Sequence, residues 1–257
     1  MPKPLHVHRY GPDAPPQVLA IHGLTGHGRR WEHLAADHLP DIAMAAPDLL
    51  GHGRSPWQAP WTIDANTSAL AELVAEPVVV VGHSFGGAIA LHLAATHPEL
   101  VKGLVLLDPA VGLDGEWMRD IADSMLASPD YPDRAEARDE KRFGSWDDVD
   151  DTQLDAELDE HLIELDSGRV GWRINIPAMM SYWSELTRPI CLPAKQTPTV
   201  LLRATRTSPP FVTDAALTGL HERLGGAFEL IDVDCNHMVA QAEPAKTAAV
   251  IRQLLAA

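Results

Sequence analysis

The sequence of 257 residues is short of several residue types, and each shortage excludes a class of protein. Its two cysteines, Cys191 and Cys235, are too few for a disulfide framework, and neither has the CxxC or Cys/His spacing of a zinc site. We interpret both as reduced structural thiols. No run approaches the roughly 20 apolar residues that span a bilayer, and residues 1–6 lack the apolar stretch of a signal peptide. The sequence therefore predicts a cytoplasmic protein with no membrane span.

Basic residues are also scarce. The chain has 20 Lys and Arg against 36 Asp and Glu, which gives a formal net charge of −16. A nucleic acid or an anionic membrane surface has to be met by clustered Lys and Arg, so this composition argues against both as partners. Apolar residues make up 46% and charged residues 22%, which is typical of a soluble globular protein with one large core.

Short apolar runs alternate with helix-length segments along the chain. Runs that are apolar on both faces and separated by helices are typical of a parallel sheet covered on both sides. An alternating segment at residues 5–10 fits an edge strand. We therefore predict an α/β fold with a mostly parallel central sheet and helices on both faces. The predicted strands are residues 18–21, 42–46, 78–81, 104–107, 200–202 and 228–233. The predicted helices are residues 29–39, 63–75, 85–96, 214–224 and 244–255.

One region departs from this alternation. Residues 111–195 contain no strand-like run, and 20 acidic residues there face 9 basic ones, so 9 − 20 = −11 of the net charge lies in this third of the chain. We predict a helical cap (lid) at residues 111–195, inserted into a core domain of residues 1–110 and 196–257. The cap helices are expected near residues 115–126, 151–165 and 178–186. The acidic run at residues 147–151 lacks the pattern of a calcium-binding loop and is interpreted as solvated and helix-capping.

The strongest chemical signal is the segment Gly82-His83-Ser84-Phe85-Gly86, which has the pattern G-x-S-x-G. A run of four valines precedes it and an Ala/Leu-rich helix follows it. Such a sharp turn lifts the serine hydroxyl off the sheet, and the two glycines avoid collisions in strained backbone. The N-terminus of the following helix favours negative charge that develops beside the serine. Ser84 is therefore the candidate nucleophile.

A serine hydroxyl needs a base that takes its proton, and the chain offers 13 histidines. His237 follows the last predicted strand, so it shares one rim of the sheet with Ser84 and is the candidate base. His22 and His52 lie in glycine-flanked loops on the same rim and are interpreted as structural. His83 is expected to point along the other face of its strand.

Two further motifs join the serine and histidine motifs. Residues 22–26 read His-Gly-Leu-Thr-Gly, and residues 48–55 read Asp-Leu-Leu-Gly-His-Gly-Arg-Ser. Along nearly its whole length the sequence resembles the α/β-hydrolase superfamily, which has an HG loop and a D-x-x-G-H-G-x-S stretch at these places. The resemblance implies an oxyanion hole formed by the backbone N–H groups of Leu24 and Phe85. It also implies that the cap follows the family's sixth strand, here residues 104–107.

The resemblance extends, more loosely, to actinobacterial carboxylesterases and lipases, through Asp108-Pro109 and the Asn236-His237 pair. The acid of the triad departs from the usual family pattern, because the loop after the seventh strand, residues 203–210, has no carboxylate. The acid has to reach His237 Nδ1 to fix its tautomer. We favour Asp108, at the end of the strand after the nucleophile helix. Asp214, and a Ser–His dyad or a water-assisted histidine, remain as alternatives.

A serine rather than an aspartate at position 84 excludes the alkyl-enzyme chemistry of dehalogenases and epoxide hydrolases that resemble this fold. The sequence predicts a serine hydrolase that cleaves carboxylic esters through an acyl-enzyme, a carboxylesterase or small lipase, with no organic cofactor and no metal. Carbon–carbon bond hydrolases, perhydrolases and aminopeptidases would use the same residues. A slow-turnover ligand-binding protein of the same fold also remains open.

The substrate is harder to infer. The cap segment 176–183 is apolar, and we expect Met179, Met180 and Trp183 to contact the substrate, although a role in the core of the cap is equally open. Trp117, Trp146 and Trp172 lie nearby in sequence with the same two interpretations. The acidic cap favours a neutral, partly apolar small-molecule ester by its long-range field. The sequence gives no indication of the oligomeric state.

Overall fold

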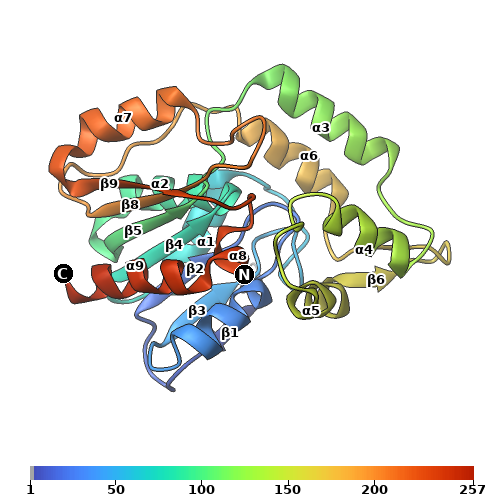
Figure 1. The fold of residues 1–257 in the computed structure, drawn as a ribbon, viewed down its shortest axis with the longest axis horizontal. Coiled ribbons are helices and arrows are strands. Elements are labelled where there is room, and N and C mark those ends of the chain that lie inside the picture. The colour runs from blue at the N-terminus through green and yellow to red at the C-terminus, as the bar shows by residue number, and fades with distance from the viewer. Residues whose placement is uncertain (1–2) are drawn as a thin grey trace.

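A seven-stranded sheet organises the protein, which we describe from a computed structural model over residues 3–257 (Figure 1). The strand order is β1-β3-β2-β4-β5-β8-β9, and all neighbours are parallel except β1, which pairs antiparallel with β3 at one edge. The predicted fold class is confirmed, including the edge strand. The strands are β1 (Val7–Tyr10), β2 (Val18–Ile21), β3 (Met44–Pro47), β4 (Val78–His83), β5 (Val101–Leu107), β8 (Thr199–Ala204) and β9 (Phe228–Val233).

Successive side chains of each strand point to opposite faces of the sheet. Both sets are apolar and pack into hydrophobic clusters, so the sheet is buried on both faces. In β4, Val78 and Val80 face one hydrophobic cluster, whereas Val79 and Val81 face another. The first cluster is covered by α1 (Ile63–Ala71), α2 (Phe85–Thr96) and α7 (Asp214–Leu224). The second is covered by η1 (Gly28–Trp31), η2 (Leu34–His38), α8 (Val239–Ala242) and α9 (Pro244–Ala256). Two short 3-10 turns, η3 (Pro98–Leu100) and η4 (Gly225–Ala227), complete the core.

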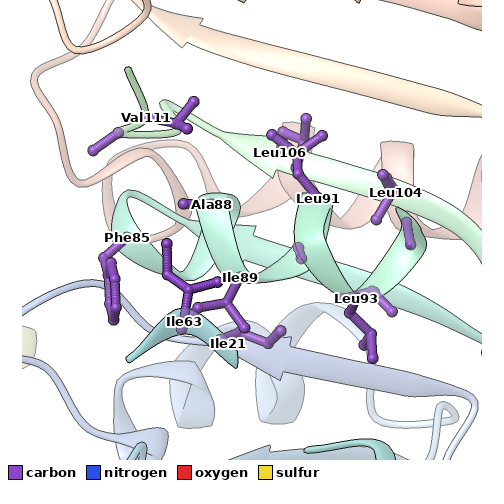
Figure 2. Close-up of a cluster of buried hydrophobic side chains, with 14 of the residues drawn as sticks. Ile21, Ile63, Phe85, Ala88, Ile89, Leu91, Leu93, Leu104, Leu106 and Val111 are labelled. Atoms are coloured by element: carbon purple, nitrogen blue, oxygen red, sulfur yellow. The ribbon is translucent and has the colours of Figure 1, made fainter. Parts of the chain in front are cut away.

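Helix α2 lies deepest in the first cluster. Figure 2 shows its side chains packed against Ile21 of β2, Ile63 of α1 and Leu106 of β5. Its Ile89 and Leu91 are fully buried, and each such side chain stabilises the fold by about 1.5–3 kcal/mol relative to an exposed one. The turn at the start of α2 is therefore held by a tightly packed core.

The core differs from the sequence prediction in two places. The helix predicted at residues 63–75 ends at Ala71. Residues 29–39 were expected to form one helix, but they form the 3-10 turn η1 and the wider π-helical turn η2. The side chain of His27 makes no capping hydrogen bond at the start of this segment. A regular helix therefore lacks its usual N-terminal stabilisation there.

Residues 111–195 follow β5, the strand that corresponds to the family's sixth, and Figure 1 shows their helices gathered on the side of the molecule away from α7 and α9. Asp114, Asp133 and Asp150 each accept a backbone N–H as N-caps, which agrees with the helix-capping interpretation of the acidic residues. The helices are α3 (Gly115–Ala127), α4 (Arg134–Arg142), α5 (Asp151–His161) and α6 (Ile176–Glu185).

The expectation that this region has no strands was wrong. β6 (Leu162–Glu164) and β7 (Val170–Trp172) form an antiparallel hairpin, and β6 occupies the end of the segment that was predicted as helix 151–165. Strands of three residues are too short to show a period of two. Helix α4 was also missed, because seven of its nine residues, RAEARDEKR, are charged and leave no apolar stripe.

The division into a core of residues 1–110 and 196–257 and a cap of residues 111–195 remains a prediction, and residues 1 and 2 lie outside the described residues. Within residues 3–257, no helix has the length and apolar character needed to cross a membrane.

Candidate active site

Ser84 lies at the turn between β4 and α2, as the sequence predicts. Its backbone has φ 53° and ψ −121°, a strained conformation for a residue with a side chain. The Ser84 N–H donates to the carbonyl oxygen of Leu107 at 3.0 Å, and its own carbonyl accepts from Gly87 and Ala110. A Cβ atom at Gly86 would lie 2.3 Å from the carbonyl oxygen of Ile21, so only glycine fits there. Close backbone packing therefore fixes the position of the serine.

Two backbone N–H groups beside Ser84 were predicted as an oxyanion hole. Phe85 is the first residue of α2, where an N–H group has no partner within the helix. Leu24 lies in the loop after β2, and its N–H group makes no hydrogen bond to any residue from 3 to 257. The next residue, Thr25, has φ 57°, which turns the loop sharply. Leu24 lines the same cavity as Ser84, whereas Phe85 is not among its lining residues, and the oxyanion hole remains a prediction.

His22 holds this loop in place. Its Nε2 accepts from the Leu49 N–H at 3.0 Å, so Nδ1 carries the proton and donates to the carbonyl oxygen of Gly23 at 2.7 Å. The ring of His52 packs edge-on against it at 5.0 Å. Burial lowers the pKa of both rings, that of His52 to about 4, so they stay neutral. This agrees with the structural interpretation of these two histidines.

His237 and Asp108 form the shortest contact of the site. His237 Nδ1 lies 2.6 Å from Asp108 Oδ2, and the carboxylate is 1% exposed. The second oxygen, Asp108 Oδ1, accepts from the Ala204 N–H at 3.2 Å. Asp108 ends β5 with φ 42°, a conformation that turns its carboxylate toward the loop after β9. A carboxylate at Nδ1 orients the ring so that Nε2 remains available to take a proton.

The alternative acid, Asp214, lies elsewhere. It is the first residue of α7, where Thr213 is the N-cap, and its side chain is exposed. No hydrogen bond or ion pair among residues 3–257 joins it to His237. Of the two candidate acids, the structure brings Asp108 and not Asp214 to the histidine.

His83 was expected to point along the other face of its strand, and its place in the alternation of β4 agrees, since it shares the face of Val79 and Val81, which pack near α8. From that face it also contacts the loop that carries His237. Its Nε2 lies 2.9 Å from the carbonyl oxygen of His237, and the two rings lie 4.7 Å apart. Burial lowers the pKa of His83 well below its ordinary value, so the ring is neutral and donates this hydrogen bond.

Ser84, His237 and Leu24 all line one cavity of about 630 Å³. The Ser84 hydroxyl is not hydrogen-bonded to His237 in this structure, and such contacts often form only when a substrate is bound. The remaining wall is mostly apolar and comes largely from residues 111–195. Its main apolar members are Ile121, Met125, Trp146, Trp172, Ile174, Trp183, Leu186 and Phe211.

The three residues expected to contact substrate divide between this wall and the core. Trp183 lines the cavity, but Met180 does not, and Met179 is fully buried in the first hydrophobic cluster. Among the other tryptophans, Trp146 and Trp172 line the cavity. Trp117 lies behind it and stacks on Phe211 at 5.3 Å.

Within residues 3–257, one group of side chains could hold a metal ion. Potential ligand atoms of His6, His8 and Asp48 lie within 4.8 Å of one another. The Asp48 carboxylate already accepts from the N–H groups of Gly28 and Arg54, and none of the three residues lines the cavity that contains Ser84. A metal there would not reach the reacting atoms.

Known proteins resemble this chain in sequence. A family model described as "Alpha/beta hydrolase family" matches residues 18–250. The chain is 64% identical over 255 residues to Lipase LipV of Mycobacterium tuberculosis, covering 98% of this chain and 97% of that protein. A segment of 95 residues is 37% identical to the pimeloyl-[acyl-carrier protein] methyl ester esterase of Neisseria meningitidis and covers 37% of each chain.

Solved structures share the fold at low sequence identity. The E-2-(acetamidomethylene)succinate hydrolase has a TM-score of 0.83 at 21% identity, covering 98% of this chain and 95% of that one. A marine microorganism esterase has a TM-score of 0.76 at 22% identity, covering 98% and 99%. The sequence match spans most of the chain and the fold agrees with it, so this protein belongs to the alpha/beta hydrolase family.

Proposed function

We propose that this protein hydrolyses carboxylic esters, with Ser84 as nucleophile, His237 as general acid and base, and Asp108 as the acid of the triad. The observation that carries the proposal is the 2.6 Å contact between Asp108 and His237 at a cavity that Ser84 also lines. The 64% identity to a protein named Lipase LipV supports ester hydrolysis rather than another reaction of the family.

In the proposed reaction, His237 Nε2 takes the Ser84 proton as the hydroxyl oxygen attacks the ester carbonyl carbon. The carbonyl oxygen becomes an oxyanion that accepts hydrogen bonds from the Leu24 and Phe85 N–H groups. His237 then returns the proton to the departing alcohol, which leaves an acyl group on Ser84. A water molecule, deprotonated by His237, attacks this acyl-enzyme and releases the acid.

Asp108 supports both steps without touching the substrate. Its buried carboxylate stabilises the imidazolium that forms when His237 accepts a proton. The hydrogen bond from His83 to the His237 carbonyl oxygen holds the backbone of the same loop. We assign the apolar cavity wall, with Trp183 among its members, to the partly apolar portion of a small-molecule ester, and residues 111–195 to a cap domain over it.

A fluorophosphonate probe together with p-nitrophenyl esters tests the proposal. We expect rapid labelling and ester turnover in the wild type, and loss of both in Ser84→Ala. The exposed Ser68→Ala is the matched control and should keep both. Peptide amides and dienoates should remain uncleaved. An unlabelled wild type, or labelling that persists in Ser84→Ala, would contradict the proposal.

A further inference from the structure

A buried carboxylate beside the cavity gathers three basic side chains. Glu157 of α5 has a side chain that is 1% exposed. Its Oε1 accepts from Arg30 Nη2 at 2.6 Å and from Lys141 Nζ at 2.8 Å. Its Oε2 accepts from His27 Nε2 at 2.8 Å and from Arg30 Nε at 3.0 Å. Each carboxylate oxygen therefore already has two donors.

The charges in this cluster do not balance. Arg30 and Lys141 carry two positive charges against the single negative charge of Glu157, even with His27 neutral. The Arg30 and Lys141 side chains are 5% and 10% exposed, so water compensates little of the difference. Burial lowers the pKa of Lys141 to about 8, and Glu157 opposes this shift while Arg30 adds to it. Buried charge without a partner is costly, so the cluster would be stabilised by one more anion.

Arg30 and Lys141 both line the substrate cavity together with Ser84. Lys141 Nζ lies 4.2 Å from the ring centre of Trp172 and 5.1 Å from that of Trp146, which holds the ammonium between two indoles. Among residues 3–257, Lys141 Nζ makes one hydrogen bond, to Glu157.

The carboxylate of Glu140 does not supply the anion that this cluster lacks. Glu140 also lines the cavity, but the residue is exposed and its Oε1 accepts from the Tyr131 hydroxyl at 2.6 Å. Water and the Tyr131 hydroxyl therefore stabilise its charge where it lies. Two of the three donors of Lys141 Nζ therefore remain open to a ligand in the cavity.

We propose that Arg30 and Lys141 form a subsite for a carboxylate at the far end of the substrate, so that the preferred substrates are hemi-esters of dicarboxylic acids. This inference rests on the proposed function, because Ser84 would cleave the ester at the other end of the same cavity. The excess of one positive charge matches a singly charged carboxylate better than a phosphate dianion. The apolar wall, including Ile121 and Met125, fits the methylene chain between the two ends.

This proposal opposes the neutral substrate that the acidic composition of residues 111–195 favours. Charges spread over a solvated surface are screened beyond about 8 Å at physiological salt. The Arg30 and Lys141 charges lie in the cavity wall and are desolvated, so they act on a bound ligand with little screening. The local charges therefore determine which substrates the cavity prefers.

Matched substrates test the subsite. The mono-p-nitrophenyl esters of adipate and suberate are compared with p-nitrophenyl hexanoate and octanoate, which have the same number of carbons in the acyl chain. We expect kcat/KM to be at least about tenfold higher for the hemi-esters, since a charge-assisted hydrogen bond contributes this much. The ratio should fall to about one in Lys141→Met, stay high in Lys141→Arg, and be unchanged in the exposed control Lys195→Met. A wild-type ratio of one or less, or a ratio that Lys141→Met leaves unchanged, would overturn the proposal.

Binding provides a readout without turnover. Adipate and suberate are titrated calorimetrically into Ser84→Ala, with and without Lys141→Met, and thermal unfolding checks that each variant is folded. We expect the added Lys141→Met substitution to weaken binding about tenfold. If dicarboxylates bind in this way but no ester is cleaved, the proposed function fails and the subsite stands. If neutral esters are cleaved while dicarboxylates do not bind, the subsite alone is wrong.

Discussion

The two ends of the cavity are built in different ways. At the Ser84 end the backbone does most of the positioning, through the positive φ angles of Ser84 and Asp108 and the close approach of Gly86 to Ile21. At the other end, long side chains from η1 and α4 converge on Glu157 of α5. The groups proposed to react are thus held by the core, whereas the proposed carboxylate subsite is held by side-chain pairing between distant segments.

The two regions also differ in how they are packed. The sheet lies between two large hydrophobic clusters, while residues 111–195 contribute a small cluster around Trp146 and Leu154. Met238 belongs to that small cluster, and the N–H of Asn236 donates to Asp148 at 2.5 Å. The loop that carries His237 is therefore supported by residues 111–195 as well as by the sheet. A change in residues 111–195 can reach the proposed catalytic residues through this loop.

The largest effect is expected from Asp108→Asn at the Ser84 end of the cavity, which we call the backbone-built end. The amide would leave His237 in the wrong tautomer and its imidazolium unstabilised, so kcat should fall by about 10⁴-fold, as in serine proteases with the same change. The burial of Asp108 and its contact with His237 make this the sharpest test of the site. Steady-state kinetics with p-nitrophenyl butyrate measures it.

Asp214→Asn is the matched control, because Asp214 is exposed at the start of α7. It should turn over at a rate close to that of the wild type. If Asp108→Asn kept near-normal kcat while Asp214→Asn lost it, the assignment of the acid would have to be reversed.

The backbone-built end was largely predictable from the sequence. The valine run, the G-x-S-x-G turn and the helix after it are contiguous, so they determine the position of Ser84 locally. The role of His237 was predicted from the rule that loops after parallel strands share one rim of the sheet. The role of Asp108 was predicted from its place at the end of a strand. The sequence left Asp108 and Asp214 open, because their distances to His237 depend on how β5 and α7 sit in the fold.

The side-chain pairing around Glu157 at the other end of the cavity, which we call the charged end, was not predictable from the sequence. Arg30 and Glu157 are 127 positions apart, and no local pattern indicates that they pair. Lys141 lies on α4, which has no apolar stripe and was missed. Periodicity reports which face of an element is buried, but it does not report which charged side chains meet across elements. The same limit explains why Met179 was expected in the cavity and is found in the core.

The second largest effect is expected from Glu157→Gln at the charged end. Burial alone would raise the Glu157 pKa, but Arg30, Lys141 and His27 lower it well below its ordinary value, so the residue is a carboxylate. The amide would leave two buried cations without their shared anion, which should destabilise the fold by about 3–5 kcal/mol. Urea unfolding measures the change. The exposed Glu140→Gln should have less effect, and an equal effect would show that the buried charge pairing is unimportant.

A smaller loss of stability is expected from Gly86→Ala at the backbone-built end. The added methyl would collide with the carbonyl oxygen of Ile21, which has no room to move in β2, and overpacking of this kind costs about 1–3 kcal/mol. Activity should fall with it, because the turn that holds Ser84 would shift. Gly115→Ala is the control, since its added methyl would meet nothing within 4 Å. Urea unfolding of both variants, with ester kinetics, makes the comparison. Equal stability of the two would mean that the turn is less tightly packed than its geometry indicates.

The smallest effect is a pH dependence that belongs to the charged end alone. Lys141 faces Glu157, Arg30 and Glu140, and its pKa of about 8 means that it loses its charge as the pH rises through that value. The substrate carboxylate stays ionised over the same range. The preference for hemi-esters over neutral esters should therefore decline between about pH 7 and pH 9, in ratios of kcat/KM that cancel pH effects common to both substrates. In Lys141→Arg the guanidinium remains charged, so the preference should persist through pH 9. A decline of the same size in Lys141→Arg would assign the titration to another group.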